Sequence, residues 1–85
     1  SPIEEVLAAH QSKAVKAVRE LWGITQEELA RVLGKSSTTI SNWETDNTQM
    51  SITDRRMLAG WLTDQGVVVE QINQRLALAE ALKAS

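Results

Sequence analysis

The sequence predicts a single small all-α domain, and three observations support this fold class. Its 85 residues fit one domain and leave no room for a second. Glycine and proline are scarce, at four and one, and most of the glycines separate segments in which apolar residues recur every three or four positions. The only β-like run, Val67–Val69, is too short for a half-buried strand. We expect a domain of five helical segments whose thin core favours oligomerisation.

The first expected segment covers residues 2–22 and opens with good helix-starting residues. Ser1 is a suitable N-cap, and Pro2 fits the first helical position. The polar stretch His-Gln-Ser-Lys at 10–13 is typical of an interruption, with Ser12 as a second N-cap. We therefore expect this segment to be broken near its middle.

The second and third expected helices are joined by a glycine turn. Residues 25–28, Thr-Gln-Glu-Glu, form a capping-box pattern, and the helix that they open ends at Gly34. Ser36 caps the next helix, in which Ile40 and Trp43 point inward. Its outward positions carry short, uncharged polar side chains: Ser37, Thr38, Ser41, Asn42 and Thr45.

Two more helices follow a polar loop at 46–49. Ser51 caps the fourth, whose apolar side is formed by Ile52, Ala59 and Leu62. We expect Trp22 and Trp43 to lie in the core. For Trp61, which is next to the apolar side of the fourth helix, core and subunit interface are both open.

The last expected helix, 68–84, has more apolar surface than one small domain usually covers. Its two neighbouring stripes are Val69, Ile72, Leu76 and Ala79, and Leu78 with Leu82. We expect a domain at 1–66 followed by a dimerising helix at 67–85, although packing of this helix on its own domain stays open. The expected dimer interface consists of Val69, Ile72, Leu76, Ala79 and Trp61.

Composition excludes several kinds of site. The chain has no cysteine and a single histidine, His10, so we expect neither disulfides nor a metal site. No apolar run approaches the roughly 20 residues of a membrane span, and the N-terminus is acidic where a signal peptide is basic. No paired carboxylates, nucleophile–base set or phosphate loop stands out. We expect a cytoplasmic, non-enzymatic protein with no cofactor, membrane partner or evident small-molecule effector.

The charge balance limits how the chain could bind a polyanion. Nine basic and eleven acidic side chains give a formal net charge of −2, and no segment is basic overall. Binding to a nucleic acid would therefore depend on where charges lie rather than on their number.

The most informative spacing lies at 25–45 and predicts a helix-turn-helix. Ala30 lets two short helices approach closely, Gly34 ends the first, and Ile40 and Trp43 wedge the second against it. These residues resemble the Cro/C1 (Xre-type) family of DNA-binding repressors, over roughly residues 15–62. The family pattern is matched by Thr25-Gln26-Glu27-Glu28-Leu29-Ala30, Gly34, Ser36, Ile40-Ser41 and Trp43-Glu44.

The resemblance implies a role for individual residues. The second helix of the motif would lie in the major groove, where Ser37, Thr38 and Asn42, with Ser41 beside them, would contact bases. Gln26 would bond a phosphate and brace Ser37. The expected phosphate contacts are Gln26, Lys35, Ser36, Thr45, Asn47, Arg55 and Arg56. Arg19 and Glu44 stand where the family has a structural pair.

The chain also departs from the family pattern in and after the motif. Lys35 occupies a turn position that is usually apolar, and Arg55 and Arg56 fall in a usually apolar stretch. Asp46 stands where glycine is common and Met50 where proline is common. The loop that normally lies along the DNA backbone is therefore expected to differ, and an aspartate there would repel phosphates.

The sequence thus predicts a homodimeric repressor that binds an inverted-repeat operator on double-stranded DNA. Its small size suggests a regulator of a plasmid, phage or other mobile element, and its general appearance resembles the plasmid Kor-type repressors. The alternative is an antitoxin or co-regulator that uses the fold to bind a protein partner, which the acidic balance slightly favours.

Overall fold

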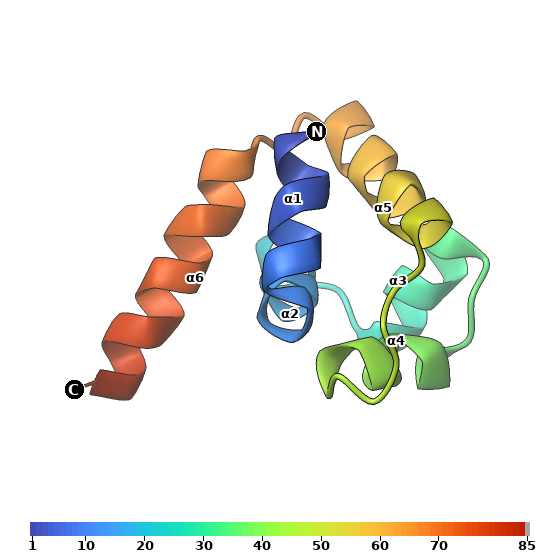
Figure 1. Cartoon of the computed structure of the whole chain (residues 1–85), viewed down its shortest axis with the longest axis horizontal. Coiled ribbons are helices and arrows are strands. Elements are labelled where there is room, and N and C mark those ends of the chain that lie inside the picture. Colours follow the sequence, from blue (N-terminus) through green and yellow to red (C-terminus); the bar gives the residue numbers. More distant parts are fainter. Residues whose placement is uncertain (85) are drawn as a thin grey trace.

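A computed structural model describes residues 1–84, and this part of the chain consists of six helices and no strands. They are α1 (Pro2–Ala9), α2 (Gln11–Trp22), α3 (Gln26–Leu33), α4 (Ser37–Glu44), α5 (Ile52–Asp64) and α6 (Val69–Ala84), as Figure 1 shows. The all-α prediction is confirmed, with six helices instead of five because the first segment is divided. Within residues 1–84, no helix has the length and apolar character required to cross a membrane.

The division between α1 and α2 lies at His10. Its backbone angles, φ −136° and ψ 47°, are not helical, so this residue ends α1 and precedes α2. The expected break is confirmed, but the expected cap is wrong. Helix α2 begins at Gln11 without a side-chain cap, which leaves Ser12 inside its first turn.

The local signals around α3 and α4 are all confirmed. The Thr25 hydroxyl accepts a hydrogen bond from the Glu28 amide, and the Glu28 carboxylate accepts one from the Thr25 amide, each at 3.1 Å. Gly34 ends α3 with φ 66°, a left-handed conformation that suits glycine. The Ser36 hydroxyl then accepts from the Thr39 amide at 3.2 Å and caps α4.

Helix α2 lies at the centre of the packing. Helix α4 packs against α2 and α3, α5 packs against α1, and α6 runs along α2 and also contacts α1. Figure 1 shows α6 on one side of α1 and α2, with α3, α4 and α5 on the other. Every helix contributes to one core, for example through Leu7, Val18, Leu29, Ile40, Leu58 and Ile72. The first half of α6 therefore packs on its own domain.

The core differs from the expected one at two positions. Trp43, Ala59 and Leu62 are buried as predicted. The prediction for Ile52 is wrong: it begins α5 and is 57% exposed, because α5 turns its Leu58 side toward the core. Trp22 is also not in the core; it is 41% exposed at the end of α2.

The indole of Trp22 lies beside that of half-buried Trp61. The two ring centroids are 5.9 Å apart and the planes are tilted by 47°. The ring of Trp22 therefore packs at the surface, where α2 ends before Gly23, instead of beneath the helices.

Candidate nucleic-acid interface

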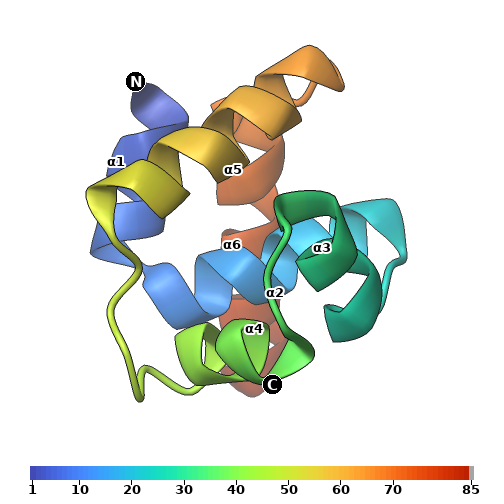
Figure 2. The same ribbon diagram turned by 90° about the vertical axis from the view of Figure 1, so that its right-hand side faces the viewer.

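Helix α4 presents a polar, uncharged face to solvent because its apolar side is buried in the core. Ile40 and Trp43 are buried against α2 and α3, which fixes the orientation of the helix. Of the predicted base-contacting residues, Thr38 is exposed, and three are half-buried: Ser37, Ser41 and Asn42. All four side chains are short hydrogen-bonding groups, and the structure brings them together on one short helix. Figure 2 shows α4 at the end of the domain far from the N-terminus.

A clamp between Arg19 and Glu44 holds the end of α4 on α2. Arg19 Nη2 donates to Glu44 Oε1 at 2.8 Å and Nε donates to Oε2 at 2.5 Å. Arg19 Nη1 also donates to the carbonyl of Ile24 at 3.2 Å. The Glu44 side chain is only 2% exposed, so this pair satisfies a carboxylate that would be costly to bury alone. Its hydrogen bonds to Glu44 raise the pKa of Arg19 above the ordinary value, against a smaller lowering by burial.

Gln26 joins this clamp and does not brace Ser37 as the resemblance implied. Its Nε2 donates to Glu44 Oε1 at 3.2 Å, while no hydrogen bond joins it to Ser37 in the described chain. The two residues do line one shallow groove, together with Arg19, Thr25 and Glu27. The first residues of α3 and α4, Gln26 and Ser37, thus lie at this groove, and helix N-termini attract anions. Glu27 opposes that attraction.

The basic residues expected to contact phosphates are bound to other parts of the protein. The Lys35 ammonium lies 3.1 Å from the Asp54 carboxylate, and Arg55 Nη1 donates to the Met50 carbonyl at 3.2 Å. Arg56 lies 3.9 Å from Glu4 in the first turn of α1, which Figures 1 and 2 place at the opposite end of the domain from α4. The Arg56 side chain is 72% exposed, and its expected phosphate contact stays a prediction.

The remaining expected phosphate contacts lie at the two ends of α4. Ser36 caps its start, and the Thr45 hydroxyl donates to the Ser41 carbonyl at 3.0 Å. The Asn47 amide donates to the Asn42 carbonyl at 2.9 Å, and its side-chain Nδ2 approaches Asn42 Oδ1 at 3.5 Å. The loop thus folds back onto the end of the helix. All three side chains are exposed beside the outward face.

Asp46 turns the chain immediately after α4. Its φ of 59° is the only positive value outside glycine in the described residues. A left-handed backbone explains why glycine is common at this position in the family that the motif resembles, and aspartate tolerates it better than most residues. The structure therefore keeps the turn but places a carboxylate in it.

Gln11 is an interacting residue that the sequence reasoning missed. Its side chain, from a residue only 6% exposed, bonds three backbone groups of the segment that includes the end of α4 and the following loop. A signal was present: Gln11 has the same helical phase as the buried Ala14, Val15 and Val18. A polar residue at an inward position indicates a buried hydrogen-bonding partner.

Comparisons with known proteins agree with this geometry. A family model described as helix-turn-helix matches residues 15–59, which is more than half of the chain. No curated protein and no solved structure gave a significant match.

Proposed function

The chain belongs to the Cro/C1-type helix-turn-helix family, which indicates a DNA-binding transcription regulator, and we propose that it acts as a homodimeric repressor on an inverted-repeat operator. The observation that carries this proposal is the outward face of α4. It has hydrogen-bonding side chains and no formal charge. The helix that carries it packs against α2 and α3 and is joined to α2 by an ion pair. Such a face suits the edges of bases better than it suits a protein core or an active site.

Within this proposal, Asn42 supplies the most selective contact. Its carboxamide nitrogen can donate to N7 of adenine while its oxygen accepts from the N6 amino group in the major groove. Ser37, Thr38 and Ser41 offer hydroxyls, which both donate and accept and therefore discriminate less. Direct readout would depend on few side chains, so the shape of the DNA would contribute the rest.

The proposed dimer uses the second half of α6. Ile72 is fully buried in its own domain, and Val69 and Leu76 pack against that core, so these three residues of the expected interface have little surface to offer. Farther along the helix, Leu78 and Leu82 are exposed, with Ala79 between them. Two copies joined there by a two-fold axis would place their α4 helices in successive major grooves, about 34 Å apart.

Two narrower expectations stay predictions. One is an origin in a plasmid, phage or other mobile element, and the other is the similarity to plasmid Kor-type repressors. The alternative role, an antitoxin or co-regulator that holds a protein partner, still has the net charge of −2 in its favour.

The experiment that tests the proposal is a selection of random DNA duplexes by the purified protein, followed by sequencing of the bound pool. We expect an enriched inverted repeat with half-sites about one helical turn apart. A variant with both Asn42→Ala and Thr38→Ala serves as the control and should enrich no such site. If the wild-type chain enriches no sequence even at low salt, the proposal is wrong, and capture of a protein partner becomes the next experiment.

A further inference from the structure

Every hydrogen-bonding group of the Gln11 side chain is used by the backbone around the end of α4. Nε2 donates to the carbonyls of Trp43 at 3.1 Å and Thr48 at 2.8 Å, and Oε1 accepts from the Met50 amide at 2.7 Å. Only one orientation of the carboxamide satisfies these three groups. One side chain from the start of α2 thus fixes the last turn of α4, the loop and the residue before Ser51.

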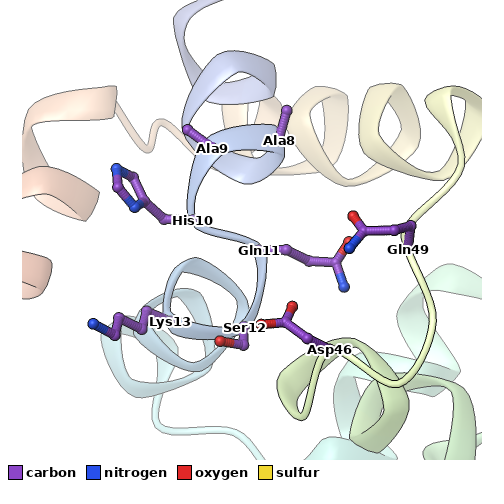
Figure 3. Close-up of a pocket in the computed structure, with 8 residues that line it drawn as sticks. All are labelled: Ala8, Ala9, His10, Gln11, Ser12, Lys13, Asp46 and Gln49. Carbon is purple, nitrogen blue, oxygen red and sulfur yellow. The ribbon is translucent and has the colours of Figure 1, made fainter.

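The loop depends on this side chain because it has no regular structure of its own. Met50 is buried at 2% exposure, and its amide would lack an acceptor without Gln11. A buried backbone group without a partner is unfavourable, so loss of Gln11 would favour rearrangement of the loop. Figure 3 shows the Gln11 side chain reaching from the start of α2 toward this loop, near Asp46 and Gln49.

The same loop is hydrogen-bonded to the predicted base-contacting residue. The amides of Asn47 and Thr48 lie 2.9 and 3.5 Å from the Asn42 carbonyl. Asn47 Nδ2 also approaches Asn42 Oδ1 at 3.5 Å, so the loop contacts the Asn42 carboxamide directly. Thr48 is therefore held by Gln11 through its carbonyl and faces Asn42 through its amide.

We propose that Gln11 is a positioning residue for sequence-specific DNA binding. It does not face the DNA itself; it fixes the loop after α4, in which the Thr48 amide faces the Asn42 backbone carbonyl and Asn47 Nδ2 approaches the Asn42 carboxamide. This role rests on the proposed function and adds to it a determinant of specificity that lies on another helix.

The test replaces Gln11 with methionine, which has a similar length but cannot make these hydrogen bonds. Dissociation constants are measured for a duplex from the selected pool and for a scrambled duplex of equal length, at a temperature where circular dichroism shows each variant folded. We expect Gln11→Met to weaken binding to the selected duplex about tenfold and to leave the scrambled duplex within about twofold. Gln65→Met, at an exposed residue after α5, is the matched control and should change neither.

A loss that is equal for both duplexes, or no loss, overturns the role of Gln11. A wild-type chain that fails to distinguish the two duplexes overturns the proposed function first, and the role of Gln11 with it. The two failures are therefore separated by the wild-type measurement.

A second variant, Gln11→Glu, gives a readout that a purely structural role would not move. Burial and the two carbonyls of Trp43 and Thr48 disfavour the charged form, so they raise the pKa of the introduced carboxyl above its ordinary value. Once protonated, it again donates one hydrogen bond and accepts one. The preference of this variant for the selected duplex should therefore recover as the pH falls.

The pH test needs the wild-type profile because other titratable groups line the same pocket. These are His10, Asp46 and Lys13, the last of which is paired with Glu80 of α6. Recovery in Gln11→Glu beyond that of the wild type supports the proposal, and Gln11→Met should show none. An identical pH profile for the two variants overturns it.

Discussion

Asn42 carries the only carboxamide of α4, and its replacement is the most direct test at the scale of single residues. Asn42→Ala should weaken binding to the selected duplex by about 1–3 kcal/mol, because one bidentate contact to a base is lost. Its far-UV circular dichroism should stay unchanged, since Asn42 is not part of the core. Fluorescence anisotropy titration measures the loss, and Ser41→Ala should lose less. If Asn42→Ala discriminates between duplexes as well as the wild type does, Asn42 is not a base-contacting residue.

Asp46 provides a second test, because the effect of its backbone conformation on stability can be measured separately from the effect of its charge on DNA binding. Asparagine adopts a φ of 59° as readily as aspartate, so Asp46→Asn should change the free energy of unfolding by less than about 0.5 kcal/mol. Removal of the negative charge should tighten binding to DNA of any sequence roughly two- to fivefold at low salt. The gain should vanish at high salt, as screening requires. A gain that persists in high salt would show that charge is not its cause.

At the scale of helices, the elements that could be predicted are those specified by neighbouring residues. The Thr25 capping box, the Gly34 turn and the Ser36 cap each depend on contacts within a few positions, and all three were predictable. The Arg19–Glu44 pair was predictable only through the family resemblance, since its partners are far apart in the sequence.

The errors concern residues whose environment is decided by packing between helices. The exposure of Ile52 depends on how α5 rotates against α1, and that of Trp22 depends on where α2 ends. The burial of Gln11 depends on distant groups, because its partners are 32 to 39 positions away, at the end of α4 and in an irregular loop. No local rule contains that information, although the polar residue in an apolar phase indicated a missing partner.

Helix α6 has two parts with different surroundings. Its first half is held by buried Ile72, whereas its second half contacts α2 through an exposed ion pair: Lys13 lies 2.7 Å from Glu80 and lowers the pKa of that carboxyl. Substitution of Leu76, which packs against the core, would disturb the domain together with any dimer. A test of dimerisation therefore needs a residue that the domain itself does not bury.

Leu78 meets this requirement because it is 49% exposed. Leu78→Lys should shift the protein from dimer to monomer in analytical ultracentrifugation, since it places a charge in the proposed apolar interface. Its melting temperature at a concentration where the wild type is monomeric should be nearly unchanged. Asn73→Lys, exposed on another face of α6, is the control and should remain dimeric. A Leu78→Lys protein that sediments like the wild type would place the dimer interface elsewhere.

At the scale of the whole molecule, the question is how a chain of net charge −2 binds a polyanion. Several cations are already paired with carboxylates: Lys13, Arg19, Lys35 and Arg56. Phosphates would then be bound largely by the amides at the starts of α3 and α4 and by hydroxyls and carboxamides near α4. These groups bind anions without releasing as many counterions as lysine and arginine do.

This distribution of charges predicts that the affinity for DNA decreases with salt concentration, but only weakly. Two to four neutralised phosphates would give a slope of about −2 to −4 for the logarithm of the association constant against the logarithm of salt concentration. Titrations of the selected duplex between roughly 50 and 200 mM salt measure it. Lys35→Ala distinguishes two roles of the Lys35 ammonium. If the ammonium stays with Asp54, the substitution should not change the slope. If the ammonium moves to a phosphate, the slope of the variant should be less negative by about one. A slope of zero for the wild type would contradict the neutralisation of any phosphate by lysine or arginine.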